Sequence, residues 1–226
     1  MNPLLTLPWE TLTDRSVVAA RMAALAAREI IEGRYAPGAL LTEVGVAESF
    51  GASRTPAREA MLQLERWHLV RIAPKKGAIV TAVDRSEHRD TIGVRAMFEI
   101  DALRTLQGDP AAVASLGADL RELLDLQTRA LDAGDVLAFA SADYAFHARI
   151  IRAGGNTVVM ELLDALGPRL ARLTFDVVIG HPDAVRAYRD EHARLAELAA
   201  DGRAAEFAAL VRSHIDQAHG GAGSAR

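Results

Sequence analysis

The spacing of apolar and polar positions departs from a helical period in only one segment of this chain. Apolar residues recur three to four positions apart over most of its length, which is typical of helices. Between residues 69 and 83 they fall instead in two short β-type segments, Leu69–Ile72 and Ala78–Val83, on either side of Pro74-Lys75-Lys76-Gly77. This arrangement predicts a β-hairpin with a basic tip inside an otherwise helical protein.

Three helices are expected before the hairpin, each with a suitable N-cap residue. They are residues 16–32 capped by Ser16, residues 42–50 capped by Thr42, and residues 54–67 capped by Ser53. Gly51-Ala52 makes a tight turn between the second helix and the third. In the third helix the apolar stripe consists of Ala57, Met61 and Leu64.

Six helical stretches and no strand are expected after Asp84. Glycine and proline interrupt the apolar periodicity near Gly108-Asp109-Pro110, Gly134, Gly154-Gly155, Gly180-His181-Pro182 and Asp201-Gly202. The fold class expected is mainly α, with an all-α helical bundle behind an amino-terminal domain of three helices and a hairpin. The expected divisions are an arm (1–15), the first domain (16–83), the helical domain (84–219) and a flexible tail (220–226).

Composition narrows the classes of protein to which the chain can belong. It has 226 residues and no cysteine, which excludes disulfides, zinc–thiolate sites and cysteine nucleophiles. No signal peptide or membrane span is expected, and the protein is expected in the cytoplasm. Residues 1–82 contain 10 Lys and Arg against 8 Asp and Glu, whereas residues 83–226 contain 16 against 22. A basic head and an acidic body suggest two different tasks.

The third helix has the features of a DNA-reading helix. Two helices joined by a tight glycine turn, the second with polar residues at its start, form a helix-turn-helix, whose second helix reaches base edges in the major groove. Arg54 and Arg58 project from one face, and arginine commonly pairs bidentately with guanine. Ser53 and Thr55 can hydrogen-bond phosphates, and the free backbone N–H groups from Ser53 to Pro56 favour phosphate as well.

The hairpin tip supports the same interpretation. Lys75 and Lys76 suit a wing that lies on the phosphate backbone or in the minor groove. The alternative is that the arginines only solvate a surface, with Arg58 near Glu59 and Glu65. The complete order of helix, turn, capped helix and basic hairpin favours DNA binding over this alternative.

The segment ESFGASRTPAREAMLQLERWHLVRIAPKKGAIVTAV resembles the winged helix-turn-helix of the GntR family of bacterial transcription regulators. The specific pattern is S-R-T-P-x-R-E-A, followed by L, a hydrophobic pair and G-A-x-V. The resemblance covers about residues 16–83. It implies that Arg54 and Arg58 read bases, that Ser53 and Thr55 contact phosphate, and that Gly77 sits at the wing tip.

Four polar residues interrupt the apolar stripes of the acidic body. Asp143 and His147 share a helical face with Phe146 and Ile150, while His192 and His214 fall on the apolar stripes of two other helices. One such residue alone is typical of a core histidine with a satisfied partner. Buried polar groups need partners, and one metal ion would satisfy all four. Three imidazoles and a carboxylate suit Zn²⁺, and also Ni²⁺, Fe²⁺ or Mn²⁺.

The acidic body also resembles the FCD ligand-binding domain, which follows the GntR-type winged helix in the FadR-like subfamily. The matching pieces are VRAMFEIDALR, ADYAFHARIIRAGGN, EHARLAELAADGR and VRSHIDQAH, spread over residues 94–219. The resemblance implies an all-helical bundle with a metal ion held by Asp143, His147, His192 and His214. Six rather than seven helices in this part would favour the variant called VanR-like.

The FCD resemblance also implies an effector site. The open positions of the metal, with a nearby arginine, take the carboxylate of a small organic acid in that family. Arg95 is the expected arginine, and Glu99 and Asn156 are further candidates for effector binding. The alternative for Arg95 is a salt bridge to Glu99, one helical turn later.

The function expected is that of a metabolite-responsive transcription regulator. A homodimer would bind a near-palindromic operator DNA, and repression released by the effector is expected. The main alternative is a metal-dependent hydrolase, because a His₃Asp metal with an open position could activate water. However, no second acid–base group has an evident place near the metal, and no Ser-His-Asp or P-loop signature is present. A third alternative is a purely structural dimerisation module.

Overall fold

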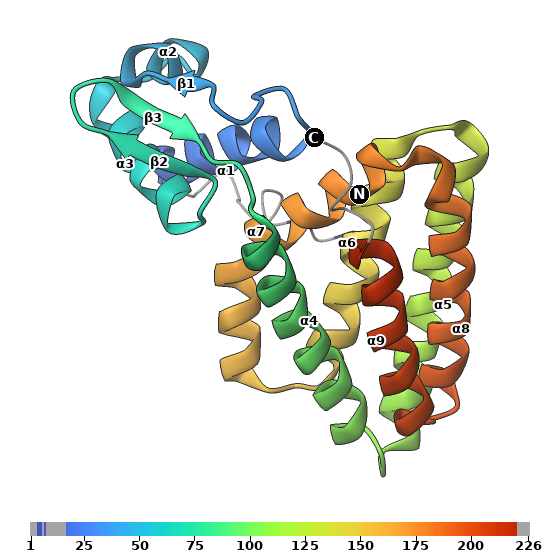
Figure 1. The fold of residues 1–226 in the computed structure, drawn as a ribbon. Coiled ribbons are helices and arrows are strands. Elements are labelled where there is room, and N and C mark those ends of the chain that lie inside the picture. Colours follow the sequence, from blue (N-terminus) through green and yellow to red (C-terminus); the bar gives the residue numbers. More distant parts are fainter. Residues whose placement is uncertain (1–3, 6, 8–16, 221–226) are drawn as a thin grey trace. The chain divides into compact units, whose positions relative to one another are not determined.

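The computed structural model describes residues 4–5, 7 and 17–220, and within them the chain forms nine α-helices, one 3-10 helix and three short strands (Figure 1). The first part of the chain contains α1 (Val18–Ile31), β1 (Leu40–Leu41), α2 (Glu43–Ser49), α3 (Arg54–Arg66), β2 (Val70–Ala73) and β3 (Gly77–Val80). The second part contains α4 (Arg85–Thr105), α5 (Pro110–Ala133), α6 (Val136–Ala153), α7 (Thr157–Gly180), η1 (Pro182–Ala184), α8 (Val185–Ala200) and α9 (Ala204–Gly220). The predicted fold class, mainly α with one small β element, is confirmed.

The chain divides into two compact units. The amino-terminal unit contains Leu7–Asp84 together with Asp164–Arg172. The helical unit contains Arg85–Leu163 and the chain from Leu173 onward. Helix α7 therefore contributes residues to both units.

The core of the amino-terminal unit forms where α1 packs against α3. The buried face of α1 is rich in alanine, and Ala23 and Ala27 are at most 1% exposed. Small side chains on this face let the two helices approach closely. Helix α3 contributes the predicted stripe of Ala57, Met61 and Leu64, all at most 2% exposed. The predicted cap Ser16 lies outside the described residues.

The three strands form an antiparallel sheet in the order β1-β3-β2. The predicted hairpin is present as β2 and β3, whereas β1 was not predicted, since two residues are too few to show a period. Gly77 opens β3, where φ is +124°, and a Cβ at this position would lie 2.2 Å from the carbonyl oxygen of Leu41. Glycine is therefore required here by the approach of β1, which gives Gly77 a structural role beside the tip rather than at it.

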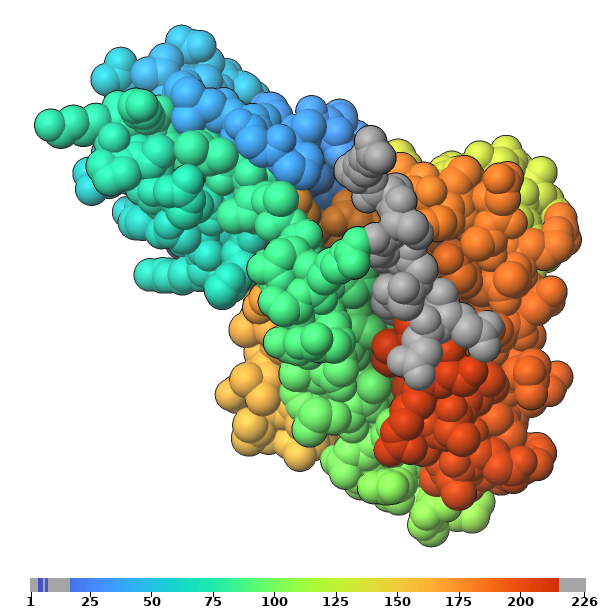
Figure 2. Space-filling model, viewed as in Figure 1, coloured from blue at the N-terminus to red at the C-terminus, as the bar shows by residue number. Residues whose placement is uncertain are grey.

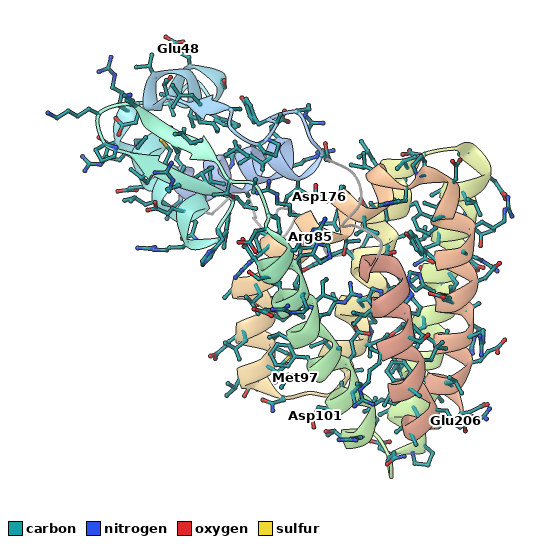
Figure 3. All side chains as sticks on the ribbon, viewed as in Figure 1. Glu48, Arg85, Met97, Asp101, Asp176 and Glu206 are labelled. Carbon is teal, nitrogen blue, oxygen red and sulfur yellow. The ribbon has the colours of Figure 1, made fainter. Side chains whose placement is uncertain are left out.

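The helical unit is a bundle around one apolar core. Helix α5 packs against α6 and α8, α4 packs against α6 and α9, and α8 packs against α9; the α4 and α9 pair is visible in Figure 2. Fully buried Leu103, Leu120, Phe146 and Phe207 join these helices. On the outer side of α4, Met97 is 67% exposed (Figure 3).

Helix boundaries in the helical unit follow local sequence signals. The Asp109 side chain caps α5 by accepting hydrogen bonds from the N–H groups of Ala111 and Ala112. Gly134, with φ +66°, ends α5 in the left-handed conformation. All five predicted interruptions separate successive helices, so the expected six helices after Asp84 are confirmed within the described residues. In that same part of the chain, no helix combines the length and the apolar character needed to cross a membrane.

Candidate nucleic-acid interface and candidate metal centre

The start of α3 presents a row of polar side chains to solvent. Ser53 occupies the N-cap position, and its side chain makes no capping hydrogen bond. Arg54, Thr55 and Arg58 are exposed, and Pro56 is partly buried. Because Arg54 and Arg58 lie four residues apart, their side chains leave the same face of the helix. This face offers two guanidinium groups and a helix N-terminus to an anionic ligand.

The two arginines of this face are not used inside the protein. Within residues 17–220, neither Arg54 nor Arg58 forms a salt bridge or a side-chain hydrogen bond. Glu65, the alternative partner of Arg58, instead accepts a hydrogen bond from the backbone N–H of Ile72 at 2.7 Å. The surface-pairing alternative therefore receives no support, and both side chains are available to an external ligand.

The tip of the β2–β3 hairpin carries two exposed lysines, Lys75 and Lys76. The turn closes where the N–H of Lys76 donates to the carbonyl of Ala73 at 3.0 Å. Lys75 has φ +63°, a left-handed conformation that glycine or asparagine adopts more easily. A lysine in this conformation costs local stability, which is typical of positions where the side chain has a function.

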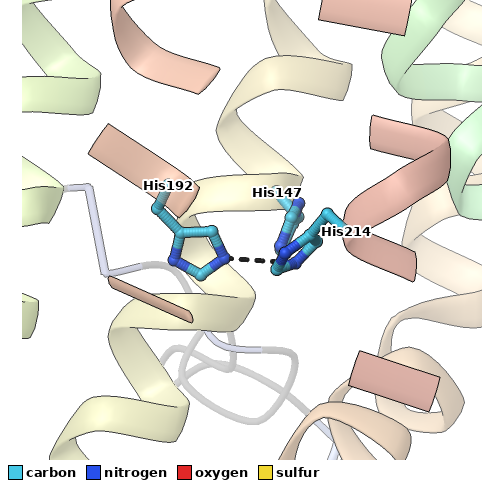
Figure 4. Close-up of side chains that lie close together, drawn as sticks. All are labelled: His147, His192 and His214. Carbon is cyan, nitrogen blue, oxygen red and sulfur yellow. Dashed lines mark hydrogen bonds between the residues drawn. The ribbon is translucent and has the colours of Figure 1, made fainter. Parts of the chain in front are cut away.

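Three histidines from three helices converge inside the helical unit (Figure 4). His147 on α6, His192 on α8 and His214 on α9 each offer a ring nitrogen, and these atoms all lie within 4.8 Å of one another. The Nε2 atoms of His192 and His214 are 3.4 Å apart. All three residues are at most 3% exposed. The histidines that interrupt three apolar stripes in the sequence therefore meet at one point.

Each histidine is held through its other ring nitrogen by an oxygen atom. The pairs are His147 Nδ1 with Glu99 Oε2 at 3.1 Å, His192 Nδ1 with Gln127 Oε1 at 3.0 Å, and His214 Nδ1 with Glu191 Oε2 at 2.5 Å. Where such an oxygen accepts, the ring carries a hydrogen on Nδ1, and Nε2 is the nitrogen that can offer its lone pair to a ligand. Outer partners of this kind fix the tautomer and the ring orientation of metal-binding histidines.

The spacing of the Nε2 atoms fits a bound cation. The Nε2 atoms of His192 and His214 are within hydrogen-bond distance at 3.4 Å, and that bond requires one ring to carry hydrogens on both nitrogens. Two lone pairs at this distance repel unless a positive charge lies among them. Nitrogen atoms held tetrahedrally at the usual zinc–nitrogen distance are about 3.3 Å apart. His147 Nε2 is buried and has no hydrogen-bond partner among the described residues. A divalent metal ion would satisfy this atom and remove the repulsion.

Asp143 lies one turn before His147 on α6 and completes the group. Its Oδ1 is 3.7 Å from His147 Nε2, and its Oδ2 is 3.8 Å from His192 Nε2. Burial raises the pKa of Asp143 to about 6 and lowers the pKa of His147 and of His192 well below the usual value. Neutral imidazoles and an ionised carboxylate are the forms that bind metal near neutral pH.

Arg95 and Glu99 on α4 are buried beside the cluster. Arg95 Nε lies 3.1 Å from Glu99 Oε1, an ion pair that is not aligned as a hydrogen bond. Burial raises the pKa of Glu99 to about 7, and the charge of Arg95 opposes this rise. The salt bridge considered as an alternative for Arg95 is therefore present, and Arg95 faces the cluster as well.

A small pocket connects Arg95 to the histidine cluster. Its lining comes from four further helices besides α4, and consists of Arg95, Asp143, Thr174, Val177, Val178, Tyr188 and His214. The volume available inside it is about 10 Å³, close to what one water molecule needs. The pocket brings together the guanidinium group of Arg95, two candidate metal ligands (Asp143 and His214) and the hydroxyl groups of Thr174 and Tyr188. This lining suits a small polar anion.

Asn156, the other candidate for effector binding, does not join this group. It is exposed and caps α7, where its Oδ1 accepts from the N–H groups of Val158 and Val159 at 3.1 and 3.2 Å. An asparagine before a helix is as typical of an N-cap as of a ligand contact. Asn156 therefore serves as a helix cap and is absent from the pocket lining, and a part in effector binding stays a prediction.

Comparison with known proteins assigns the family. The model of the FCD domain matches residues 90–217, and the model of the bacterial regulatory proteins of the gntR family matches residues 19–80. The chain belongs to the GntR family. It is a transcription regulator with a GntR helix-turn-helix domain and an FCD domain.

Several curated relatives of this GntR regulator are themselves regulators. An uncharacterized HTH-type transcriptional regulator of Agrobacterium vitis is 34% identical over 118 residues, which cover 52% of this chain and 69% of the relative. The gluconate operon transcriptional repressor of Bacillus licheniformis is 27% identical over 70% of this chain and 64% of its own length. The Uxu operon regulator of Haemophilus influenzae is 30% identical, and the match covers 70% of this chain and 61% of the relative. The chain thus spans about two thirds of the length of these relatives.

Solved structures share the fold. A GntR protein from Rhodococcus sp. RHA1 has a TM-score of 0.75 at 24% identity, with 92% of this chain and 99% of that chain covered. Escherichia coli McbR/YncC has a TM-score of 0.72 at 19% identity, with 89% and 95% covered. These likenesses support a winged helix-turn-helix followed by an all-α domain. With the family shown, the alternative of a metal-dependent hydrolase is rejected.

Sequence reasoning missed the residues that orient the cluster. Gln127 and Glu191 hold His192 and His214, and Tyr188 and Thr174 line the pocket. Gln127 carries a detectable signal, since a glutamine at a buried position of α5 needs a partner. Glu191 and Tyr188 have no comparable signal, because charged and amphipathic residues are common on helices.

Proposed function

We propose that this GntR regulator binds a near-palindromic operator as a homodimer and releases it when a small carboxylate effector binds in the helical domain. The proposed DNA-binding domain is 16–83 and the proposed effector domain is 84–219. Two-fold symmetry would place two copies of α3 in successive major grooves. Such a protein acts in the cytoplasm, where its operator lies.

For DNA recognition, we assign base reading to Arg54 and Arg58 of α3. Ser53 and Thr55 hold phosphate at the helix N-terminus, and Pro56 fixes the backbone of the first turn. Lys75 and Lys76 of the wing neutralise further phosphates. The assignment is supported by the absence of internal partners for the two arginines among the described residues.

For effector recognition, we assign a divalent metal ion, with zinc preferred, to Asp143, His147, His192 and His214. The ion supplies a Lewis acid that holds an anionic oxygen. Arg95 supplies a positive charge on the same pocket, and Glu99 orients both Arg95 and His147. The six helices of this domain within the described residues fit the VanR-like variant.

The names of the relatives bear on the direction of control. The relative from Bacillus licheniformis is named a gluconate operon transcriptional repressor. The relative from Paenarthrobacter nicotinovorans is named a probable D-xylose utilization operon transcriptional repressor. Repression is therefore the proposed mode. Gluconate is a sugar acid, so sugar acids are the first effectors to test, before dicarboxylates, aromatic acids and amino acids.

The observation that carries this proposal is the convergence of three Nε2 lone pairs whose partner Nδ1 atoms are each held by an oxygen. A core that only needed to be filled would not orient three imidazoles inward in this way. The arrangement supports a binding centre that is preorganised for a cation.

The test is a fluorescence-anisotropy titration of the full chain against the DNA upstream of its own gene, with a scrambled duplex as control. Near-physiological salt suppresses nonspecific binding. A preference for the native duplex of about 100-fold or more is expected. If both duplexes bind equally and weakly, selection from genomic fragments follows, and failure to recover any preferred duplex there would refute the proposal.

A further inference from the structure

Helix α7 joins two sets of contacts that lie two residues apart. Arg172 is the last residue that α7 contributes to the amino-terminal unit. Thr174, in the helical unit, lines the pocket together with Val177 and Val178. Because α7 is one continuous helix, a displacement of its pocket wall moves Arg172 as well.

Arg172 makes a two-fold contact with one residue of the amino-terminal unit. Its Nη1 donates to Thr81 Oγ1 at 3.0 Å, and its Nη2 donates to the carbonyl of Thr81 at 2.5 Å. Arg172 is 4% exposed and Thr81 is half-buried, so these charge-assisted bonds are partly shielded from water. The two nitrogens of the guanidinium fork match two acceptors of a single residue, whereas a lysine offers one nitrogen without this fixed geometry.

Thr81 in turn holds the end of the reading helix. Its hydroxyl donates to the carbonyl of His68 at 2.8 Å, and its N–H donates to the carbonyl of Leu69 at 3.1 Å. His68 and Leu69 form the exit from α3, where the N–H of Leu69 returns to the carbonyl of Leu64 at 3.0 Å. His68 adopts φ +59°, a conformation that a non-glycine residue keeps only where its surroundings hold it.

The pocket must change for an effector to enter. Its volume of about 10 Å³ admits roughly one water molecule, and a carboxylate group is larger. Val177 and Val178 are buried, and α7 supplies three of the seven lining residues. The remaining lining residues include Asp143 and His214, which the metal-type cluster holds in place. The α7 wall is therefore the part that has to yield.

We propose that Arg172 is a positioning residue that transmits effector entry to the reading helix through Thr81. The inference rests on the proposed function, since it takes the pocket as the effector site. When the α7 wall moves, the bonds from Arg172 to Thr81 change, and the exit of α3 loses its support. The exposed face of Arg54 and Arg58 then changes its presentation to DNA.

The test uses a steric wedge in place of the unidentified effector. Val178→Phe enlarges a side chain of the α7 wall, and operator affinity is measured for the full chain by anisotropy in four proteins: wild type, Val178→Phe, Arg172→Met and the double variant. We expect Val178→Phe to weaken operator binding about tenfold, and by less than about twofold when Arg172 is already Met. An equal effect of the wedge in both backgrounds, or no effect in either, would overturn the proposal.

Three further variants separate a positioning role from a merely structural one. Arg172→Lys keeps the charge but replaces the two-nitrogen fork by one ammonium nitrogen, so part of the wedge effect should return. Arg186→Ala removes an exposed helix arginine and should leave the wedge effect intact. Thr81→Val preserves shape and the backbone carbonyl that accepts from Arg172 Nη2 but removes the shared hydroxyl, so it should reduce the wedge effect, though less than Arg172→Met does. Thr81→Val with a full wedge effect would contradict the coupling route. If thermal melts show that Val178→Phe does not fold, Val178→Leu provides a smaller wedge for the same cycle.

Hydrogen exchange gives a measurement that needs no operator, so that failure of the proposed function and failure of this inference can be told apart. The Leu69 amide should exchange about tenfold faster in Val178→Phe than in wild type. The wedge should add nothing to the exchange rate of Arg172→Met. If the wedge accelerates exchange equally in both backgrounds, or in neither, the coupling through Arg172 is refuted, whatever the DNA titrations show.

Discussion

The face of α3 and the histidine cluster use polar residues in opposite ways. Arg54 and Arg58 are exposed, and the structure gives them no internal partner within residues 17–220. The cluster residues are buried and held from outside by Glu99, Gln127 and Glu191, while their inner atoms point at one another. In both regions, the function is inferred from polar side-chain atoms that remain available to bind a ligand.

The difference between the two regions lies in what they cost the fold. Exposed arginines remain hydrated, so their replacement should change binding without changing stability. The buried His147 Nε2 loses hydration without gaining a hydrogen-bond partner among the described residues, which destabilises the metal-free chain. Binding of a cation should therefore stabilise the helical unit, because a ligand that binds only the folded state raises its stability.

The largest effect should follow from removing a cluster histidine. In His192→Ala, the bound metal loses one ligand, and we expect its affinity to fall by at least about 100-fold, more than the usual effect of an outer partner. Metal content by mass spectrometry and a competitive chelator titration measure this. His68→Ala, which changes an exposed histidine, is the control and should keep full metal content. Equal metal content in both variants would contradict the assignment of a metal ion to the histidine cluster.

The next effect concerns the reading face. Arg58→Ala should weaken operator binding by about 1–3 kcal/mol and relax base preference at one position of each half-site, because a bidentate base contact is lost. The melting temperature should not change, since the side chain has no internal partner. Arg104→Ala on α4 is an exposed-arginine control. Retained base preference in Arg58→Ala would show that the reading face has been misassigned.

A smaller effect is expected from an outer partner of the cluster. Glu191→Gln keeps a hydrogen-bond acceptor for His214 Nδ1 but removes its charge, so metal affinity should fall about tenfold. Isothermal titration with Zn²⁺ or Ni²⁺ measures the change. Glu197→Gln, an exposed residue of the same helix, should bind metal as the wild type does. Indistinguishable affinities for the two variants would mean that the contact of Glu191 with His214 has no bearing on a metal.

The smallest effects are expected at Lys75, where one substitution should raise the stability of the fold and lower the affinity for the operator. Lys75→Gly relieves the left-handed φ of +63°, and we expect a gain of about 0.5 kcal/mol in the free energy of unfolding, because part of the relief is offset by the more flexible unfolded chain. Operator affinity should fall a few-fold, with a weaker salt dependence. Lys76→Gly removes the same charge without relieving a left-handed φ, so its operator affinity should fall likewise while its free energy of unfolding falls, because only the more flexible unfolded chain contributes. A lower stability for Lys75→Gly would contradict the assignment of strain.

Periodicity was sufficient to predict the helices and the hairpin because their apolar stripes are long and their ends are marked by glycine and proline. The same stripes revealed Asp143, His147, His192 and His214, since a polar residue at an apolar position stands out. Strand β1 could not be predicted, because its two residues, Leu40 and Leu41, are too few to show a period. The role of Asn156 as a helix cap could not be distinguished from a ligand contact, because both leave the same mark in the sequence.

Contacts between distant parts of the sequence lay beyond what a pattern can show. Arg172 and Thr81 are 91 positions apart, and neither interrupts a periodicity. Gln127 is 65 positions from His192 and belongs to another helix. Such pairs depend on how helices pack, which is set by the whole core rather than by any local signal.

The most direct test of the account is the release of the operator by a carboxylate. The metal-loaded full chain, bound to its labelled operator duplex, is titrated with sugar acids, dicarboxylates, aromatic acids and amino acids, and anisotropy is followed for the wild type and for His147→Ala. The account predicts that at least one class of carboxylate releases the duplex from the wild type and that His147→Ala does not respond to it. Release from both proteins at the same concentration, or from neither by any class, would contradict it.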